Sequence, residues 1–289
     1  MIITNIHDLP PPVVRAAIHA ESSHDIGDAD FSVTGLIEPP RIRVLTKKYE
    51  KMLSKDASEV GDSMRGTALD AWLGKFIEGE EMANVRLFVE VECDGKWYTI
   101  SGEFDWFDPI SGRLEDWKSP GVYEWTHPKA EREIQLNIYA YLLAKHGYTV
   151  NRIGNTFLFK DYSPSTAEYK GEDYPPASIS SADVDRVRRW SNTEVEEYIR
   201  GRIRLHRDST EETLCTDEDR WLENKWAVMN EHGTRAMNNA TFDSEDAAEA
   251  FCDTQDIPHD RIEFRAGAPR RCKHWCDVAE FCEQYAGER

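Results

Sequence analysis

The hydrophobic pattern of the chain changes from a helical period to a strand-like one in its central part. Apolar residues recur at spacings of three and four between about residues 63 and 79, which predicts an amphipathic helix. Its apolar stripe consists of Leu69, Trp72, Leu73 and Phe76. Residues 85–93, 97–107 and 113–118 then predict three strands, with a hairpin turn at Asp94-Gly95 between the first two.

A second helix and a fourth strand follow this hairpin region. Residues 130–146 form a helical segment that ends at Gly147, and residues 150–160 are rich in strand formers. The order helix, three strands, helix, strand predicts a mixed fold of the α/β (α+β) class. Beyond it we expect a loop over residues 161–179 and a long helix over about 181–206.

The same pattern divides the chain into three parts. Residues 1–60 are expected to form a helical N-terminal arm, because Pro10-Pro11-Pro12 suits the first turn of a helix. Residues 61–207 contain the mixed core. Residues 208–289 are expected to form a C-terminal helical segment that carries a cluster of cysteines.

The composition indicates a folded chain, since 40% of the residues are hydrophobic and 11% are aromatic. The longest apolar runs, such as residues 87–91, are too short to cross a bilayer. The N-terminus lacks the basic and apolar regions of a signal peptide. We therefore expect a cytoplasmic protein with no membrane partner.

The net charge of −19 is unusual for a protein that binds nucleic acid, because such proteins usually have a basic footprint. Binding requires only a local basic track, however. Two stretches offer one: Arg186, Arg188, Arg189, Arg200, Arg202, Arg204 and Arg207, and then Arg265, Arg270, Arg271 and Lys273. The alternative is that these side chains form ordinary solvated faces.

Two carboxylates and a lysine fall at the ends of neighbouring predicted strands. Asp105 lies near the end of one strand, and Asp116 and Lys118 lie near the end of the next. Neighbouring strands are about 5 Å apart and residues two apart share a face, so the three side chains can meet. Mg²⁺ or Mn²⁺ prefers oxygen ligands, which Asp105, Asp116 and the backbone carbonyl of Trp117 can supply.

A metal ion at this point would activate a water molecule and neutralise charge on a phosphate. Lys118 would orient or deprotonate that water and stabilise the transition state. On the next helix, Gln135 and Tyr139 are four residues apart and share a face, from which they could hold a phosphate or a flipped base. The alternative is that these are ordinary polar strand ends, which are common.

The pattern Gly102…Asp105…Asp116-Trp117-Lys118…Gln135-Leu136-Asn137-Ile138-Tyr139 resembles the RecB-like and Cas4-like branch of the PD-(D/E)xK nucleases. The chain from Phe31 to Cys282 is similar to phage-encoded exonucleases of this branch. The resemblance implies a restriction-endonuclease-like αβββαβ core and metal-dependent hydrolysis of DNA at ends or in single strands. It assigns catalysis to Asp105, Asp116 and Lys118, and substrate binding to Gln135 and Tyr139. It also implies a role in phage-type recombination, replication or repair, with a partner protein from these processes.

Two positions depart from the family's pattern. The helix before the strands usually carries a metal-binding histidine, but here Gly66-Thr67-Ala68-Leu69 is followed by Asp70. Asp70 is therefore a further candidate ligand for a hard cation, and the alternative is a solvent-facing helix residue. A glutamate that often precedes the first strand is replaced by Asn84.

Four cysteines have a spacing that suits a metal centre: Cys215, Cys272, Cys276 and Cys282. Four thiolates can hold a [4Fe–4S] cluster or a tetrahedral zinc ion, and the remaining alternative is a set of reduced, buried thiols. Related nucleases often carry a [4Fe–4S] cluster on one distant cysteine and a C-terminal trio. The resemblance thus favours the cluster, although the first gap of the trio is three residues here rather than two.

Two functions of different classes follow from the sequence. The first is a metal-dependent deoxyribonuclease, of exonuclease type. The second is a catalytically inactive DNA-binding or protein-interaction module on the same fold, which the acidic charge and the residues at positions 70 and 84 would permit. A sequence-specific endonuclease shares the chemistry, but no base-reading domain is evident.

Overall fold

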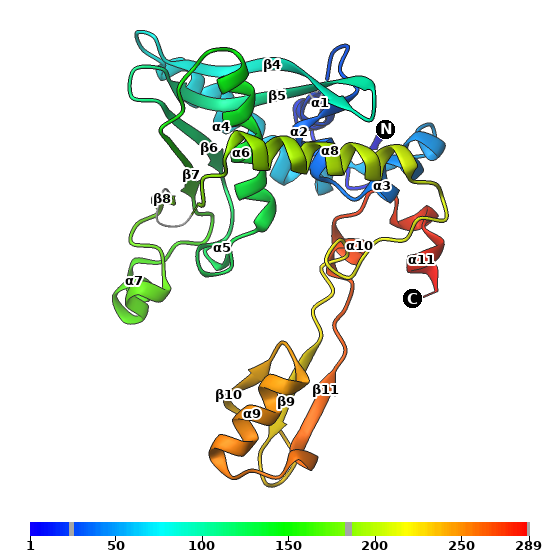
Figure 1. Ribbon diagram of the computed structural model, residues 1–289, viewed down its shortest axis with the longest axis vertical. Coiled ribbons are helices and arrows are strands. Elements are labelled where there is room, and N and C mark those ends of the chain that lie inside the picture. Colours follow the sequence, from blue (N-terminus) through cyan, green and yellow to red (C-terminus); the bar gives the residue numbers. More distant parts are fainter. Residues whose placement is uncertain (23–25, 183–186, 288–289) are drawn as a thin grey trace. The chain divides into compact units, whose positions relative to one another are not determined.

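The computed structural model describes residues 1–22, 26–182 and 187–287, which form two compact units (Figure 1). Unit 1 comprises Met1–Glu38 and Glu50–Ser209, and unit 2 comprises Pro39–Tyr49 and Thr210–Arg289. In the part of the chain that the structure describes, every helix is too short or too polar to cross a membrane.

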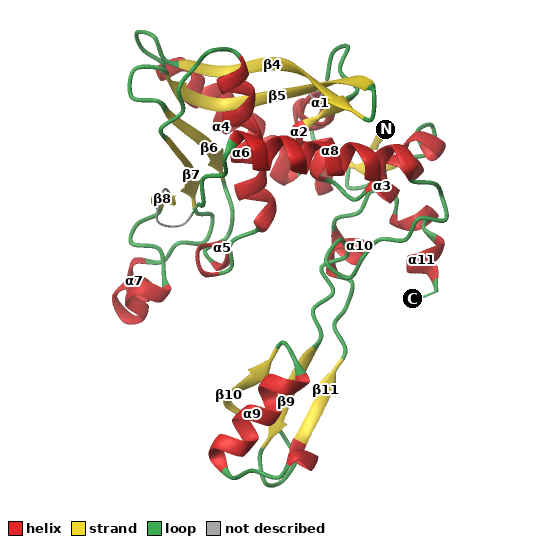
Figure 2. Ribbon diagram, viewed as in Figure 1, coloured by secondary structure: helices red, strands yellow, loops and turns green. Residues whose placement is uncertain are grey.

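A six-stranded mixed sheet forms the centre of unit 1 (Figure 2). Its strands are β2 (Phe31–Ser32), β4 (Met82–Cys93), β5 (Lys96–Asp108), β6 (Arg113–Lys118), β7 (Arg152–Leu158) and β8 (Ile179–Ala182). Strands β4, β5 and β6 are consecutive antiparallel neighbours, β7 is parallel to β6, and β8 returns antiparallel to β7. The predicted mixed class is therefore confirmed, and the three central strands lie where the pattern placed them.

The β4–β5 hairpin turns at the predicted dipeptide. Asp94 and Gly95 both have positive φ, 54° and 80°. A two-residue hairpin turn of type I′ requires this backbone conformation at both positions, and Asp-Gly adopts it readily. The turn sets the register that pairs Cys93 with Lys96 and Phe104 with Val85.

Helix α6 (Ala130–Lys145) is the central helix of unit 1 and is buried from Leu136 to Leu143. It contacts β4 to β7, α2 (Val33–Ile37) and α8 (Asn192–Asp208). Gly102 on β5 permits the close approach, because a Cβ atom there would lie 2.7 Å from Leu142 and 2.9 Å from Tyr139. This helix places the predicted Gln135 and Tyr139 against the strands.

Helix α8 begins later than the predicted start near residue 181. Ser191 accepts a hydrogen bond from the Glu194 N–H, and the Glu194 carboxylate accepts one from the Ser191 N–H, which forms a capping box. Ser181 and Ala182 instead belong to β8, while residues 183–186 lie outside the described residues. The predicted loop before them contains α7 (Pro164–Lys170) and a 3-10 turn, Gly171–Asp173.

The first part of unit 1 is helical with two short strands. It contains β1 (Ile2–Thr4), α1 (Pro11–Ser22), β3 (Ser54–Asp56), the 3-10 turn Ala57–Glu59, α4 (Gly61–Leu73) and the 3-10 turn Gly74–Phe76. The apolar stripe predicted over α4 and the turn after it is only partly buried. Trp72 is 56% exposed and Phe76 62% exposed, and their rings contact each other edge to face instead of entering the core.

Unit 2 combines helical segments with a second sheet, so its C-terminal part is not only helical as expected. The helices are α3 (Pro40–Tyr49), α9 (Glu245–Gln255), α10 (Arg270–His274) and α11 (Glu283–Ala286). Strands β9 (Lys225–Met229), β10 (Ala236–Phe242) and β11 (Ile262–Arg265) form a sheet in the order β10-β9-β11. Helix α9 packs on it through Ala248 and Cys252, which is why Cys252 is a buried core residue.

Candidate functional site

Asp105 on β5 comes together with Asp116 and Lys118 on the neighbouring antiparallel strand β6. The strand register pairs Trp106 with Glu115, which sets Asp105 opposite Asp116. Lys118 Nζ lies 2.5 Å from Asp116 Oδ2 and 3.6 Å from Asp105 Oδ2. The structure thus assembles the three predicted catalytic side chains at one point.

Asp105 is held by the backbone of the neighbouring strand. Its Oδ2 atom accepts a hydrogen bond of 2.6 Å from the Trp117 N–H. Burial, and next the charge of Asp116, raise the pKa of this carboxyl. The Trp117 carbonyl, predicted as a metal ligand, accepts a hydrogen bond of 3.2 Å from Lys118 Nζ. The ammonium thus takes one of the two acceptor positions of this carbonyl.

Asp116 provides the strongest sign that the site suits a cation. Its side chain is only 1% exposed, and among the described residues no backbone N–H or neutral side chain donates a hydrogen bond to its carboxylate oxygens. Its partner is Lys118, whose Nζ forms an ion pair with Oδ2. A buried carboxylate without hydrogen bonds is costly unless a positive charge compensates it. The donor set and the open lone pairs of Asp105 and Asp116 fit a hard divalent ion.

Asp70 on α4 joins this site electrostatically. Its pKa is raised to about 6: burial is the largest cause, Lys118 acts in the opposite direction, and Asp116 and Glu103 also raise it. Asp70 is thus within range of the charges at the strand ends. Among the residues that the structure describes, no group of three or more His, Cys, Asp or Glu side chains is arranged as a metal site. The two strand carboxylates are therefore the donors already in place, with Asp70 beside them.

Lys118 keeps its positive charge in this environment. Burial alone would lower its pKa, but Asp116 and Asp105 raise it, and the net shift is upward. A cation at this position is suited to hold an anionic phosphate or a metal-bound water rather than to act as a neutral base in this arrangement.

Gln135 and Tyr139 lie next to the carboxylates, as their helical spacing predicts. Gln135 Nε2 donates a hydrogen bond of 2.8 Å to the Tyr139 hydroxyl. Tyr139 is 5% exposed, and burial together with Asp116 and Asp105 raises the pKa of its phenol well above 10. The hydroxyl therefore stays protonated and can donate a hydrogen bond.

Three further residues near this site, Asn155, Phe157 and Arg132, are absent from the sequence prediction. Strands β6 and β7 are parallel, and their register sets Asn155 beside Asp116 and Phe157 beside Lys118. Arg132 on α6 lies close enough for its charge to act on both Lys118 and Asp116. The only signal in the sequence is the strand–helix–strand order, and it does not give the register.

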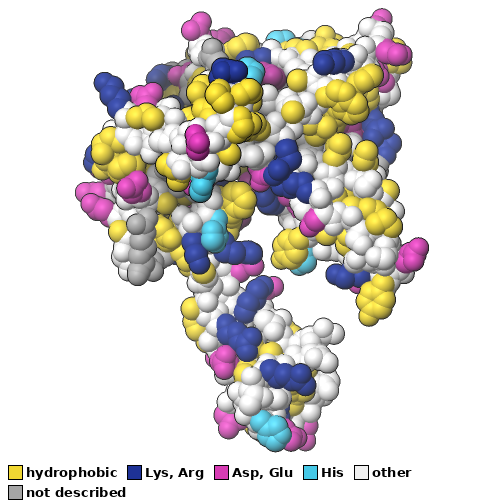
Figure 3. All heavy atoms as spheres, turned by 180° about the vertical axis from the view of Figure 1, so that it is seen from behind, with side chains coloured by type: hydrophobic (Ala, Val, Ile, Leu, Met, Phe, Trp, Pro, Cys, Tyr) yellow, Lys and Arg dark blue, Asp and Glu magenta, His cyan; other side chains and the backbone are white. Residues whose placement is uncertain are grey.

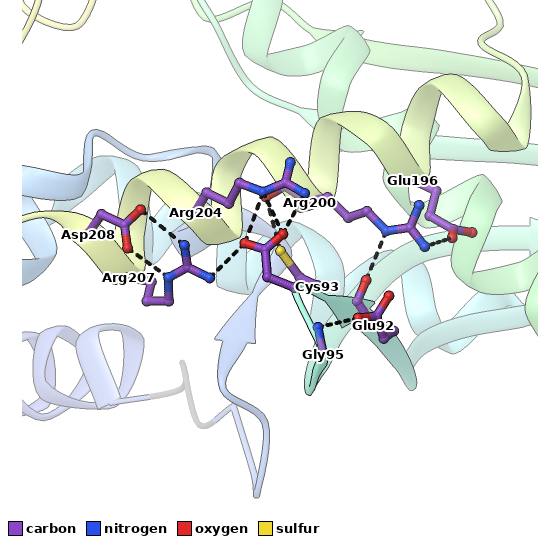
Figure 4. Close-up of polar contacts among 9 residues, drawn as sticks. Glu92, Cys93, Gly95, Glu196, Arg200, Arg204, Arg207 and Asp208 are labelled. Atoms are coloured by element: carbon purple, nitrogen blue, oxygen red, sulfur yellow. Dashed lines mark hydrogen bonds and ion pairs between the residues drawn. The ribbon is translucent and has the colours of Figure 1, made fainter.

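The described arginines of the first basic stretch form ion pairs and hydrogen bonds within unit 1. Arg204 and Arg207 on α8 bind Asp94 in the β4–β5 turn, and Arg200 donates to the Glu92 carbonyl and pairs with Glu196 (Figure 4). Arg202 donates to the carbonyls of residues 36–38. Arg188 pairs with Glu194, Arg189 donates to the Trp190 carbonyl, and Arg186 lies outside the described residues. These arginines fasten α8 to its neighbours.

The second basic stretch is similarly engaged. Arg265 pairs with Glu263 and Arg270 pairs with Glu223. Arg271 lies over the Trp221 ring, 5.0 Å from its centroid. On the face that Figure 3 shows, basic side chains occur in separate groups with acidic and apolar ones between them. Most arginines of the two stretches that the structure describes therefore have acidic or carbonyl partners.

The four predicted cluster ligands line one small cavity in unit 2. Cys215, Cys272, Cys276 and Cys282 face it together with Arg41. Arg41 Nε donates to Cys282 Sγ at 3.3 Å, and its Nη1 atom donates to the Thr213 carbonyl at 2.9 Å.

The thiols of this cavity act on one another. Burial first, and then neighbouring acidic groups that include the other three thiols, raise the pKa of Cys215 to about 12. The pKa of Cys276 rises to about 11, with burial again the largest cause. Four thiols that face one cavity fit a tetrathiolate centre by donor type. Their side chains are not in coordinating geometry within the described part of the chain.

Comparison with known proteins places this geometry in a family. Residues 35–283 match the PD-(D/E)XK nuclease superfamily. The solved structures similar to the chain include SSO0001, at 16% identity and a TM-score of 0.49, with 67% of this chain and 84% of that one covered. They also include a phage-related exonuclease from Haemophilus somnus 129PT, at 13% identity and a TM-score of 0.26, with coverage of 68% and 77%. No curated protein matches the chain. Because the family match spans most of the sequence and includes the carboxylate–lysine site, the chain belongs to the PD-(D/E)XK nuclease superfamily.

Proposed function

We propose that the chain is a Mg²⁺- or Mn²⁺-dependent deoxyribonuclease that hydrolyses phosphodiester bonds at DNA ends or in single strands. The observation that carries this proposal is the buried Asp116 carboxylate, which in the described part of the chain has Lys118 as its ion-pair partner and no backbone or neutral donor. A carboxylate with a purely structural role normally has such donors, whereas here lone pairs of Asp116 stay open to a metal ion.

Each residue has a distinct part in the proposed reaction. When bound, the metal supplies an activated water and neutralises charge on the phosphate. Asp105 and Asp116 would hold it, with Asp70 and the Trp117 carbonyl as further donors. Lys118 would orient the attacking water and stabilise negative charge on the phosphate oxygens. Tyr139, oriented by Gln135, would donate a hydrogen bond to a phosphate or a base.

The finer role follows from the sequence resemblance. We propose an exonuclease that acts in phage-type recombination, replication or repair, in the cytoplasm of the host cell and with a partner protein of that process. The test is incubation of the protein with end-labelled single- and double-stranded DNA and Mg²⁺ or Mn²⁺. Cleavage from labelled ends supports an exonuclease, and cleavage of circular DNA points to an endonuclease.

Matched variants decide whether the proposed site is responsible. Asp116→Asn and Lys118→Ala are expected to lower the rate by about 10²–10⁴-fold, as loss of a catalytic group does. Asp260→Asn, on an exposed turn of unit 2, serves as the control for purity and folding. Equal cleavage by wild-type and Asp116→Asn proteins would mean that the activity comes from elsewhere.

A second candidate function is a catalytically inactive DNA-binding or protein-interaction module. The replacement of histidine by Asp70 and the net charge of −19 favour it. This reading predicts binding of DNA or a protein without cleavage in any divalent metal. It is supported if a folded sample whose cysteine site is occupied leaves every DNA substrate intact.

We further propose a [4Fe–4S] cluster on Cys215, Cys272, Cys276 and Cys282. The shared cavity and the contact between Arg41 and Cys282 support it, because a buried guanidinium offsets thiolate charge. Anaerobically purified protein should be brown, with about four iron and four sulfide per chain. One zinc per chain and no visible absorption would favour the tetrahedral zinc alternative.

A further inference from the structure

A hollow of about 720 Å³ opens beside the proposed catalytic site in unit 1. Asn155 and Phe157 of β7 line it from the sheet. Arg132 and Ile134 of α6 line it from the helix, and Trp190 contributes to another wall. Its volume lies within the range of pockets that hold small organic ligands, about 300–1,000 Å³. The reaction as proposed so far does not use this space.

The hollow begins one strand away from the reaction centre. The β6–β7 register sets Asn155 beside Asp116 and Phe157 beside Lys118, and parallel neighbours point to the same face of the sheet. A base is joined to its own phosphate through a single sugar. A phosphate held at Asp116 and Lys118 would therefore place an adjoining base within reach of this hollow.

Asn155 is a buried polar group in the hollow. Its side chain is 2% exposed, and among the residues that the structure describes its Oδ1 atom has no hydrogen-bond donor. Buried side-chain amides are normally satisfied, so an unsatisfied one facing a cavity indicates a ligand that supplies the missing bond. An amide offers both a donor and an acceptor, which matches the edge of a nucleobase.

The charge of the walls selects a base rather than a phosphate. Among the described residues that line the hollow, there are four carboxylates and two cations: Glu124, Glu133, Glu172 and Asp173, and Lys129 and Arg132. Both cations pair with Glu124, Arg132 at 2.9 Å and Lys129 at 3.8 Å. An anionic group would meet net repulsion here, whereas an uncharged, flat ring would contact the apolar walls.

We propose that this hollow binds the nucleobase next to the scissile phosphate and that the Asn155 amide hydrogen-bonds its edge. This inference rests on the proposed nuclease function. The hollow thereby positions each nucleotide for cleavage, and its polar group makes the rate depend on which base is present.

A DNA strand with one abasic site tests the proposal. Cleavage at the abasic nucleotide should be about 10-fold or more slower than at a normal nucleotide, since base contacts of this kind are worth that much. Passage at an unchanged rate would overturn the base pocket and leave the nuclease intact. Binding of intact and abasic oligonucleotides with Ca²⁺ in place of Mg²⁺ gives the same comparison without cleavage, so the pocket is tested even if the protein is inactive.

Asn155→Leu separates a ligand-binding role from a structural one. Because Oδ1 has no donor to lose among the described residues, the variant should keep the wild-type melting temperature or exceed it. Its discrimination between intact and abasic strands should fall by about 2- to 10-fold, the worth of one hydrogen bond. Asn238→Ala, at an exposed position of β10, is the control. A stable Asn155→Leu protein with undiminished discrimination would exclude Asn155 from base recognition.

Discussion

At the scale of single residues, the proposed site is built at the expense of stability. Asp116 is buried and, in the described part of the chain, has no backbone or neutral hydrogen-bond donor, and Asp105 and Asp70 have pKa values raised first of all by burial. Natural proteins retain such unfavourable groups where function requires them. The three carboxyls repel one another in the absence of a cation, and Lys118 only partly compensates them.

The raised pKa of Asp70 gives a pH-dependent prediction. The unfolded chain releases this proton near pH 4, whereas the folded, metal-free protein keeps it up to about pH 6. Stability therefore falls as pH rises across this window, by about 1–2 kcal/mol after allowance for solvent screening. Asp70→Asn should remove this loss, so that its melting temperature in EDTA varies less between pH 4 and 7 than that of the wild type. If the melting temperatures of the two proteins depend on pH in the same way, the raised pKa of Asp70 is contradicted.

Residue identities in the site could be predicted from the sequence, while their partners could not. The spacing of Asp116 and Lys118 fixes a shared face, and that of Gln135 and Tyr139 fixes a shared helix side. Asn155 depends on a parallel register between strands that a whole helix separates. No local pattern contains that register, because it is decided by how α6 packs on the sheet.

At the scale of elements, the position of α6 depends on a glycine in β5, because this residue has no side chain. Gly102 lets the helix approach the strand, since a Cβ atom would lie within 3 Å of Leu142, Val33 and Tyr139. This approach places the Tyr139 ring near Asp105 and Asp116. The geometry of the substrate-binding side chains is thus set by backbone contact, and a glycine in a strand signals such contact.

Gly102→Ala should therefore affect stability and catalysis together. Overpacking of this kind costs about 1–3 kcal/mol, and displacement of Tyr139 should lower the cleavage rate of the remaining folded protein. Urea unfolding and rates per folded molecule measure the two effects. Gly147→Ala is unsuitable as a control because its φ is 88°, but Gly66→Ala on α4 meets nothing within 4 Å. An unchanged rate in Gly102→Ala would mean that Tyr139 tolerates the shift.

For the arginines of α8, the sequence pattern left open whether they form a nucleic-acid track or an ordinary solvated face. A row of like charges on one helix resembles a nucleic-acid track, yet Asp94, Glu92 and Glu196 engage Arg200, Arg204 and Arg207. These partners lie about a hundred residues earlier or on the same helix, and only the folded chain brings them together.

A corresponding prediction concerns DNA affinity. The double variant Arg204→Gln and Arg207→Gln should change the Kd for DNA by less than about 2-fold, because Asp94 and Asp208 already pair with the two positive charges. Lys118→Gln, which changes the group proposed to face phosphate, is the comparison. Affinity is measured by anisotropy at two salt concentrations. A large loss of DNA affinity with a reduced salt dependence in the double variant would instead support a basic track on α8.

At the scale of the whole molecule, unit 2 is assembled from two distant parts of the chain. Helix α3 contributes Arg41, and residues 210–287 contribute the four cysteines of the shared cavity. The Tyr49 ring stacks on Phe281 with centroids 4.5 Å apart, which fastens the same two parts. The composition of this unit was not predictable, because residues 39–49 lie within the predicted N-terminal arm, residues 1–60.

Loss of the proposed cluster should loosen unit 2 selectively. Metal binding by four thiols contributes to folding, and without metal the raised pKa values keep at least Cys215 and Cys276 neutral. Chelation should therefore open protease sites in residues 210–287 and increase hydrogen exchange in α3. The central sheet should keep its protection. Uniform protection before and after chelation would exclude a structural role for the metal.

The composition of unit 2 also orders events during synthesis. A ribosome releases α3 early and must then make residues 50–209, which takes roughly 8–30 s at 5–20 residues per second. During this interval the sheet of unit 1 can form and α6 can pack on it. Arg41 cannot yet contact Cys282, which has not been made. A nascent chain that is cut short would expose an orphan α3, and quality-control proteases could recognise it. The proposed cluster could form only after translation of Cys282, so an occupied cysteine site would report that synthesis has reached this residue.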